Sequence, residues 1–198
     1  MKEPPSMLLP LLRSPFQGEL LAWLFLHPEE EYAQVQLAKR FEVSQATVTR
    51  EVDRLTAAGL LVTRKIGNMR MVRADTDVVV ARPLTELLAL TYGPVAVLGE
   101  HLARVDGVEE AYIYGSWAAR YSGMAGRVPH DVDVLVVGTA DEDDLYDIAR
   151  TAEARLGREV NIRRLSREEW ASSKDDPFLQ TIKARPLVRL KLDHSENR

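Results

Sequence analysis

The stretch DVDVLVVG, residues 131–138, constrains the fold of this chain more than any other part of the sequence. A continuous apolar run of this length that is rich in Val is typical of a β-strand buried on both faces. Further strands are expected at 109–115 and 158–166, and a helix is expected at 141–157. This alternation of strands and helices predicts an α/β layer for the C-terminal half of the chain.

Asp131 and Asp133 open this strand with one residue between them. Because side chains alternate across a strand, both carboxylates are expected on the same face. Two adjacent carboxylates repel unless a cation neutralises them, and hard oxygen ligands suit Mg²⁺, or Mn²⁺ in its place. The pair therefore predicts a divalent metal site. The alternative is a solvated strand edge where two carboxylates fall together by chance.

Gly115 and Ser116 lie where the preceding strand gives way to a short expected helix. Backbone N–H groups at the start of a helix bind phosphate, and a glycine lets phosphate approach closely. Arg120 in the same helix is a further candidate for phosphate contact, with an ordinary solvent-exposed Arg as the alternative. Together with the Asp pair, these residues predict a site for a metal-bound triphosphate.

The N-terminal half has a different pattern, in which three helices precede a hairpin. The helices are expected at 16–27, 35–41 and 45–59, and the strands at 60–66 and 69–74. Ser44 is the expected N-cap of the third helix, and Gly59 ends it. Val48, Val52 and Leu55 form one apolar stripe in that helix, which leaves its polar side chains outside.

Charge is distributed unevenly along the chain. The net charge is -4, but residues 39–73 hold eight basic residues against three acidic ones, so this segment carries +5 and the rest carries -9. A local basic face on an acidic protein is typical of a nucleic-acid surface. Outward Gln, Thr and Arg side chains suit the major groove, and a basic hairpin suits the DNA backbone. The expected contacts are Gln45, Thr47, Arg50, Arg54, Arg64, Lys65 and Arg70.

Residues 33–75, AQVQLAKRFEVSQATVTREVDRLTAAGLLVTRKIGNMRMVRAD, resemble the winged helix of the MarR and ArsR regulator families, and the resemblance covers about residues 17–75. It implies that Ser44, Gln45, Thr47, Thr49 and Arg50 face double-stranded DNA, with Gly67 at the tip of the wing. Such regulators commonly bind two half-sites as homodimers. The alternative is a protein-interaction domain with a solvated basic surface. Metal sensing of the ArsR type needs Cys or His clusters, whereas this chain has no Cys and four scattered His.

Residues 108–165 resemble the minimal nucleotidyltransferases of the DNA polymerase β superfamily, whose signature is Gly-Ser, a loop and then Asp-x-Asp. The resemblance implies that Gly115 and Ser116 bind the phosphates of an NTP and that Asp131 and Asp133 bind the metal. The reaction of that family transfers a nucleoside monophosphate from the NTP to a hydroxyl of a nucleic acid, a protein or a small molecule.

The sequence departs from this family pattern in two places. Fourteen residues separate Ser116 from Asp131, which makes the loop longer than usual. The position of the family's third carboxylate holds Asn161, whose amide is a poor metal ligand and a poor base. Glu159 lies two residues earlier on the same strand face and is the candidate replacement. Binding of a Mg–NTP is therefore better supported than catalysis.

The expected fold is a two-domain protein of the α+β and α/β classes. It has a winged helix at 16–75, a helical connector at 82–105 that is a candidate dimer interface, and a nucleotidyltransferase-like domain with a small mixed sheet at 108–198. The leading expectation is a transcriptional regulator whose second domain binds Mg–NTP or a protein partner. The alternatives are an active nucleotidyltransferase and an antitoxin-like partner protein.

The expected location is the cytoplasm. The chain has no cysteine, which excludes disulfides and thiolate metal sites. No apolar run approaches the roughly 18–20 residues of a membrane span. The N-terminal stretch MKEPPSMLLPLLRSP lacks a small-residue cleavage site and is interpreted as something other than a signal peptide.

Overall fold

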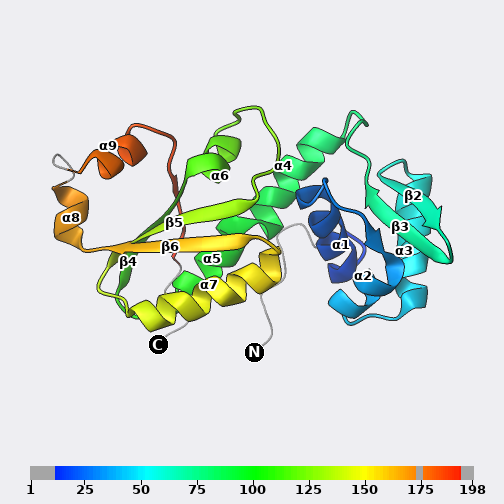
Figure 1. The fold of residues 1–198 in the computed structure, drawn as a ribbon, viewed down its shortest axis with the longest axis horizontal. Helices are drawn as coiled ribbons and strands as arrows, with labels where there is room; N and C mark the ends of the chain where they lie inside the picture. Colours follow the sequence, from blue (N-terminus) through cyan, green and yellow to red (C-terminus); the bar gives the residue numbers. More distant parts are fainter. Residues whose placement is uncertain (1–11, 173–175, 193–198) are drawn as a thin grey trace. The chain divides into compact units, whose positions relative to one another are not determined.

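The computed structural model of the chain describes residues 12–172 and 176–192. Its backbone contacts divide the chain into two compact units, with the boundary between Tyr92 and Gly93. The fold is mixed α and β, and each unit contains helices and one small sheet (Figure 1). Most of the N-terminal stretch interpreted above, residues 1–11, lies outside the described residues. Within the described ranges, no helix combines the length and the apolar character needed to cross a bilayer.

The first unit follows the predicted order of helices and hairpin closely. Its helices are α1 (Pro15–Leu26), α2 (Gln34–Arg40), α3 (Gln45–Ala57) and α4 (Ala81–Tyr92), and its strands are β1 (Tyr32–Ala33), β2 (Leu61–Ile66) and β3 (Met69–Ala74). The Ser44 hydroxyl accepts a hydrogen bond from the Thr47 N–H at 3.1 Å, which confirms the predicted N-cap of α3. The predicted stripe of Val48, Val52 and Leu55 is buried.

Strand β1 is an element that the sequence did not predict. It pairs antiparallel with β3, with Tyr32 opposite Val72, and gives a sheet of order β1-β3-β2. A two-residue strand has no periodicity of its own, and its pairing with β3 is a tertiary contact. The predicted turn at Gly67-Asn68 joins β2 to β3, and Gly67 has a φ of 58° that favours glycine.

The second unit is built on a four-stranded sheet of order β6-β5-β4-β7. Its strands are β4 (Val108–Tyr114), β5 (Asp131–Gly138), β6 (Glu159–Leu165) and β7 (Val188–Arg189), and its helices are α5 (Pro94–Leu102), α6 (Gly115–Tyr121), α7 (Glu142–Leu156), α8 (Arg167–Ala171) and α9 (Pro177–Lys183). Strand β5 has the bounds that the sequence predicts. It pairs antiparallel with β4 and parallel with β6, so it lies inside the sheet.

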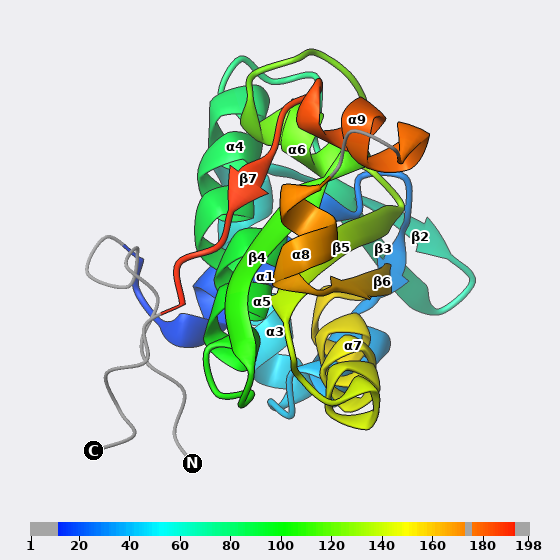
Figure 2. The same cartoon turned by 90° about the vertical axis from the view of Figure 1, so that its left-hand side faces the viewer.

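Both faces of this sheet are covered, as the apolar run of β5 requires. Helices α5 and α7 cover one face, and α8 and α9 lie over the other (Figures 1 and 2). On the second face, Leu135 and Val137 form a buried cluster with Leu165 of β6 and Leu179 of α9. The polar start of β5 lies next to this cluster, so the core fixes the position of Asp131 and Asp133.

Two short helices and an edge strand follow β6. Each helix, α8 and α9, is begun by a capping side chain, Ser166 or Asp176. Strand β7 pairs with β4, and the Leu190 N–H donates to the Ala111 carbonyl at 2.8 Å.

The segment expected to be a helical connector, residues 82–105, forms two helices that are interrupted at Gly93-Pro94. Helix α4 belongs to the first unit and α5 to the second, because the boundary between the units falls at this interruption. Pro94 occupies the first turn of α5, where its missing N–H costs nothing.

Candidate functional site

Four polar side chains lie on one face at the start of β5 and β6. The register pairs Asp131 with Glu159 and Asp133 with Asn161. Residues that are paired on adjacent strands point to the same side of a sheet, so the four side chains form two neighbouring rows. The sequence predicted that the two Asp share a face. The parallel register of β6 is the additional fact that brings Glu159 and Asn161 beside them.

Asp133 lies in the more enclosed of the two rows. Its partial burial raises the pKa of its carboxyl above the ordinary value, and the negative charge of Asp131 raises it further. A hydrogen bond with the Asn161 amide opposes this rise, and Glu159 adds a smaller repulsion. The site therefore carries negative charge that the surrounding protein only partly compensates.

Gly115 makes a close contact with this carboxylate. A Cβ atom at position 115 would lie 2.8 Å from Asp133 Oδ2, and the residue has a φ of 68°. Both the contact and the backbone angle favour glycine over any other residue. The Gly-Ser pair that begins α6 is therefore held directly against the Asp pair of β5.

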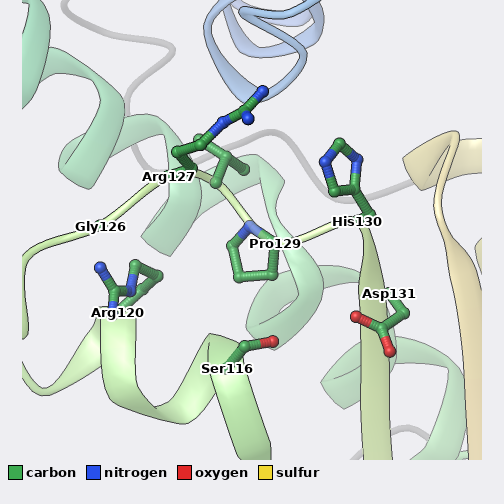
Figure 3. Close-up of a pocket in the computed structure, with 8 residues that line it drawn as sticks. Ser116, Arg120, Gly126, Arg127, Pro129, His130 and Asp131 are labelled. Carbon is green, nitrogen blue, oxygen red and sulfur yellow. The ribbon is translucent and has the colours of Figure 1, made fainter.

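A cavity of about 380 Å³ adjoins these residues and is drawn in Figure 3. Ser116 and Arg120 of α6 line one side, and the loop from Gly126 to His130 lines the other, with Asp131 at the start of β5. In Figure 3 the Ser116 hydroxyl and the Asp131 carboxylate both project into the space between α6 and β5. The long loop between Ser116 and Asp131 thus forms a wall of the cavity.

Arg120 is held in this cavity by the loop. A Cβ atom at Gly126 would lie 2.1 Å from Arg120 Nη1, so the guanidinium packs directly on the glycine backbone. The Nη1 atom is buried and has no hydrogen-bond acceptor among the residues that the structure describes. A buried guanidinium N–H without an acceptor is costly, so the contact with Gly126 holds Arg120 at a cost to the free energy of folding.

His130 has a partner other than the carboxylates. Its Nδ1 atom lies 2.9 Å from Arg158 Nη1. Because an Arg side chain can only donate, Nδ1 is the acceptor of this hydrogen bond.

The carboxylate oxygens at the start of β5 fit a divalent cation that takes only some of its ligands from the protein. Mg²⁺ keeps several waters and is commonly held by one or two carboxylates together with substrate phosphates. Asp131 and Asp133 supply two carboxylates on one face. Across residues 12–172 and 176–192, no group of three or more His, Asp or Glu is arranged to hold an ion without such additional ligands.

The residues predicted to contact DNA all lie in the first unit, on α3 and the β2–β3 hairpin. Gln45 and Arg50 are exposed, and neither side chain has a hydrogen bond or an ion pair with another described residue. Ser44 and Thr47 share a hydrogen bond at 2.8 Å between their hydroxyl groups. Thr49 donates to Gln34 Oε1 at 3.1 Å, so its hydroxyl is engaged within the unit.

Three of the predicted basic contacts are already paired with carboxylates. Arg54 pairs with Glu51, Arg70 pairs with Asp53, and Arg64 Nε lies 2.6 Å from Glu31 Oε2. Lys65 is exposed and has no such partner within the described part of the chain. Arg50 and Lys65 are therefore the cations of this set most available to phosphate.

Glu51 is a feature that the sequence did not identify. It is buried on α3, and its Oε1 accepts from Gln17 Nε2 of α1 at 2.8 Å. Arg54 balances its charge, which gives Arg54 a structural role in addition to any contact with DNA. Its spacing of three residues from Arg54 on one helix was the available signal.

The chain was compared with protein-family models, with curated proteins and with solved structures, and none of them matches.

Proposed function

We propose that this protein is a DNA-binding transcriptional regulator with a winged helix in its first unit, and that its second, nucleotidyltransferase-like unit binds a nucleoside triphosphate with Mg²⁺. The observation that carries the second half is the contact of Gly115 with Asp133, because it joins the Gly-Ser turn to the Asp pair. Asp131 and Asp133 would hold the metal, and the metal supplies charge neutralisation for the phosphates.

The cavity supports phosphate binding beside the metal carboxylates. It places the Ser116 hydroxyl and the Arg120 guanidinium on the side of Asp131 that faces α6. Arg120 lines this cavity and carries a positive charge, which favours a phosphate there. The 380 Å³ volume lies within the range of small-molecule sites.

Asn161 supports binding over transfer. It is paired with Asp133 in the register, and its amide is hydrogen-bonded to the Asp133 carboxylate. An amide in this position can orient Asp133, but it cannot take a proton from an attacking hydroxyl. A site of this composition favours a ligand-sensing role.

The first unit supports the DNA-binding half of the proposal. Its order, α1-β1-α2-α3-β2-β3, supports the proposed winged helix, in which the third helix would enter the major groove. Gln45 and Arg50 project from α3 without partners among the described residues, and such side chains read base edges. Lys65, beside the hairpin tip, would contact phosphates and add affinity without sequence information.

Two binding experiments test the proposal. Calorimetry with Mg–NTPs is expected to show binding to the wild-type protein that Asp133→Asn and EDTA both abolish. Selection from a random duplex library is expected to enrich one motif, which Arg50→Ala binds more weakly. An unchanged affinity for Mg–NTP in Asp133→Asn would refute the metal assignment. Failure of the wild-type protein to enrich any duplex would refute the DNA assignment.

Active nucleotide transfer is a second candidate function, and the position of Glu159 favours it. Glu159 is paired with Asp131 and is exposed, so a carboxylate lies on the site's face despite Asn161. The test is incubation with each α-labelled NTP, Mg²⁺ and cell lysate. Label on a macromolecule that disappears with Glu159→Gln, while Mg–NTP binding persists, would establish transfer. Absence of label with the wild-type protein would refute it.

A further inference from the structure

On the face of the sheet that carries the Asp pair, a third row of side chains follows the rows of Asp131 and Asp133. Leu135 of β5 is paired with Tyr112 on one side and with Arg163 on the other. Arg163 therefore points to the same side as Asp133 and Asn161, while the next residue, Arg164, points to the opposite side. Arg164 pairs there with Glu142 at 3.1 Å.

The ring of Phe178 lies over this row. Its centroid is 6.0 Å from that of Tyr114 on β4, with an edge-to-face angle of 87°, and 4.3 Å from Arg163 Cζ on β6. Because β4 and β6 flank β5 on either side, the ring lies above β5 beside Asp133. Helix α9 thus brings an aromatic ring to the edge of the candidate metal site.

Phe178 is exposed although its helix is firmly anchored. The residue is 37% exposed, whereas Leu179 and Ile182 of the same helix are buried. The Asp176 carboxylate accepts from the N–H groups of Phe178 and Leu179 at 2.8 and 3.2 Å. The exposure is therefore a property of a fixed ring and not of a frayed helix end.

Arg163 can contact a ligand, whereas the neighbouring Arg164 is engaged with Glu142. Its side chain is exposed, and it makes no ion pair with the carboxylates of the residues that the structure describes. Instead its Cζ atom lies 4.3 Å from the centroid of the Phe178 ring, and the residue remains exposed. Trp117 of α6 offers no alternative surface, because it is 3% exposed.

We propose that Arg163 and Phe178 form a stacking shelf for the base of the nucleotide, an inference that rests on the proposed binding of a nucleoside triphosphate. Guanidinium planes and aromatic rings both bind bases by stacking. A phosphate is a poorer occupant, because the carboxylates of Asp133 and Glu159 lie on the same face.

The positions of the shelf and the cavity fit one extended ligand. The cavity begins at Asp131, and the shelf begins at the row of Leu135, about 13 Å further along β5 at the usual rise per residue. Asp133 lies between the two. A nucleoside triphosphate with its phosphates in the cavity would reach the shelf with its base after passing the Asp pair.

The test compares Mg–NTPs with Mg–tripolyphosphate, which has no nucleoside. The variants are Arg163→Lys, which keeps the charge and removes the plane, and Phe178→Leu, which keeps the apolar volume and removes the ring. Arg164→Lys is the matched control on the opposite face. Each shelf variant is expected to weaken NTP binding by about 5- to 20-fold, as stacking contributions suggest. Binding of tripolyphosphate should not change in any of the three.

The outcomes separate the shelf from the site itself. Equal affinity of the wild-type protein for NTP and tripolyphosphate would overturn the shelf and leave the metal–phosphate site intact. A loss of affinity for both ligands in the shelf variants would assign Arg163 to the phosphates and overturn the shelf. Binding of neither ligand by the wild-type protein would overturn the proposed function together with the shelf. Nuclear Overhauser contacts between base protons and the Phe178 ring would support the shelf independently of affinity.

Discussion

Replacement of Asp133 by Asn is expected to stabilise the metal-free protein while it removes the proposed metal site. Asp133 is partly buried, and its carboxyl has a raised pKa because burial and the charge of Asp131 both disfavour ionisation. An Asn side chain has nearly the same shape and keeps an oxygen that can accept from the Asn161 amide. The substitution therefore removes the charge with little change in packing.

The size of the effect follows from the spacing of the carboxylates. Two residues apart on one strand face, the side chains of Asp131 and Asp133 are about 7 Å apart. Two unit charges at this distance repel by roughly 0.6 kcal/mol in water and by about 1.2 kcal/mol at an effective dielectric constant near 40. Since Asp133 is partly exposed and screened by solvent, we expect a gain of about 1 kcal/mol in the free energy of unfolding. For a unit of this size that corresponds to about 4 °C in Tm.

The gain should depend on pH in a definite direction. Because the pKa of Asp133 is raised in the folded state, the free energy of unfolding of the wild-type protein falls as pH rises through that pKa. The amide side chain that replaces it in the variant does not titrate. The difference between variant and wild type is therefore expected near neutral pH, and it should vanish in acid, below the ordinary carboxyl pKa.

The assay is thermal unfolding in EDTA at neutral and acid pH, repeated with Mg²⁺ and NTP. Asp143→Asn is the control, because Asp143 is an exposed residue in the first turn of α7. Its negative charge interacts favourably with the positive end of the α7 dipole, so loss of this charge should lower the free energy of unfolding by about 0.5 kcal/mol. A lower Tm of Asp133→Asn in EDTA at neutral pH would contradict the argument. Stabilisation of this variant by Mg²⁺ and NTP as large as in the wild type would contradict the metal assignment.

Of three further predictions, two use pairs of residues that differ in one respect and the third concerns Lys65 alone. Gly115→Ala and Gly123→Ala both force alanine into a positive φ, so we expect both to lower the free energy of unfolding by about 1–2 kcal/mol. Only Gly115→Ala brings a Cβ against Asp133, so only this variant should abolish Mg–NTP binding in calorimetry. Arg50→Ala should weaken specific DNA binding in a gel shift by about 1–3 kcal/mol and leave Tm unchanged. Arg54→Ala should instead lower the free energy of unfolding by about 1–2 kcal/mol, because buried Glu51 loses its partner. A lower Tm with Arg50→Ala and an unchanged Tm with Arg54→Ala would contradict these roles. Lys65→Ala should reduce the slope of log affinity against log salt concentration by about 1, and it should weaken binding to specific and random duplexes alike. A loss of affinity for the specific duplex alone would instead make Lys65 a base contact.

Local pattern predicted the elements of this protein well. The periodicity of Val48, Val52 and Leu55, the cap at Ser44 and the apolar run of β5 are signals within a few neighbouring residues, and the structure confirms each. Strand β1 was missed because two residues carry no period, and its existence depends on β3. The two-residue strand β7 likewise depends on its pairing with β4.

The sequence by itself determined that two carboxylates share a strand face and that a Gly-Ser turn precedes them, because the two-residue period of a strand is a local property. Only the tertiary structure decided what surrounds them. The parallel register brings Glu159 and Asn161 alongside, the close approach of Gly115 joins the turn to Asp133, and α9 carries Phe178 over β5. The same holds for the charges of the first unit, where Glu51 and Asp53 engage Arg54 and Arg70. Register and pairing depend on which surfaces pack together. This packing is decided by residues that are distant in the sequence, so local pattern does not reveal it.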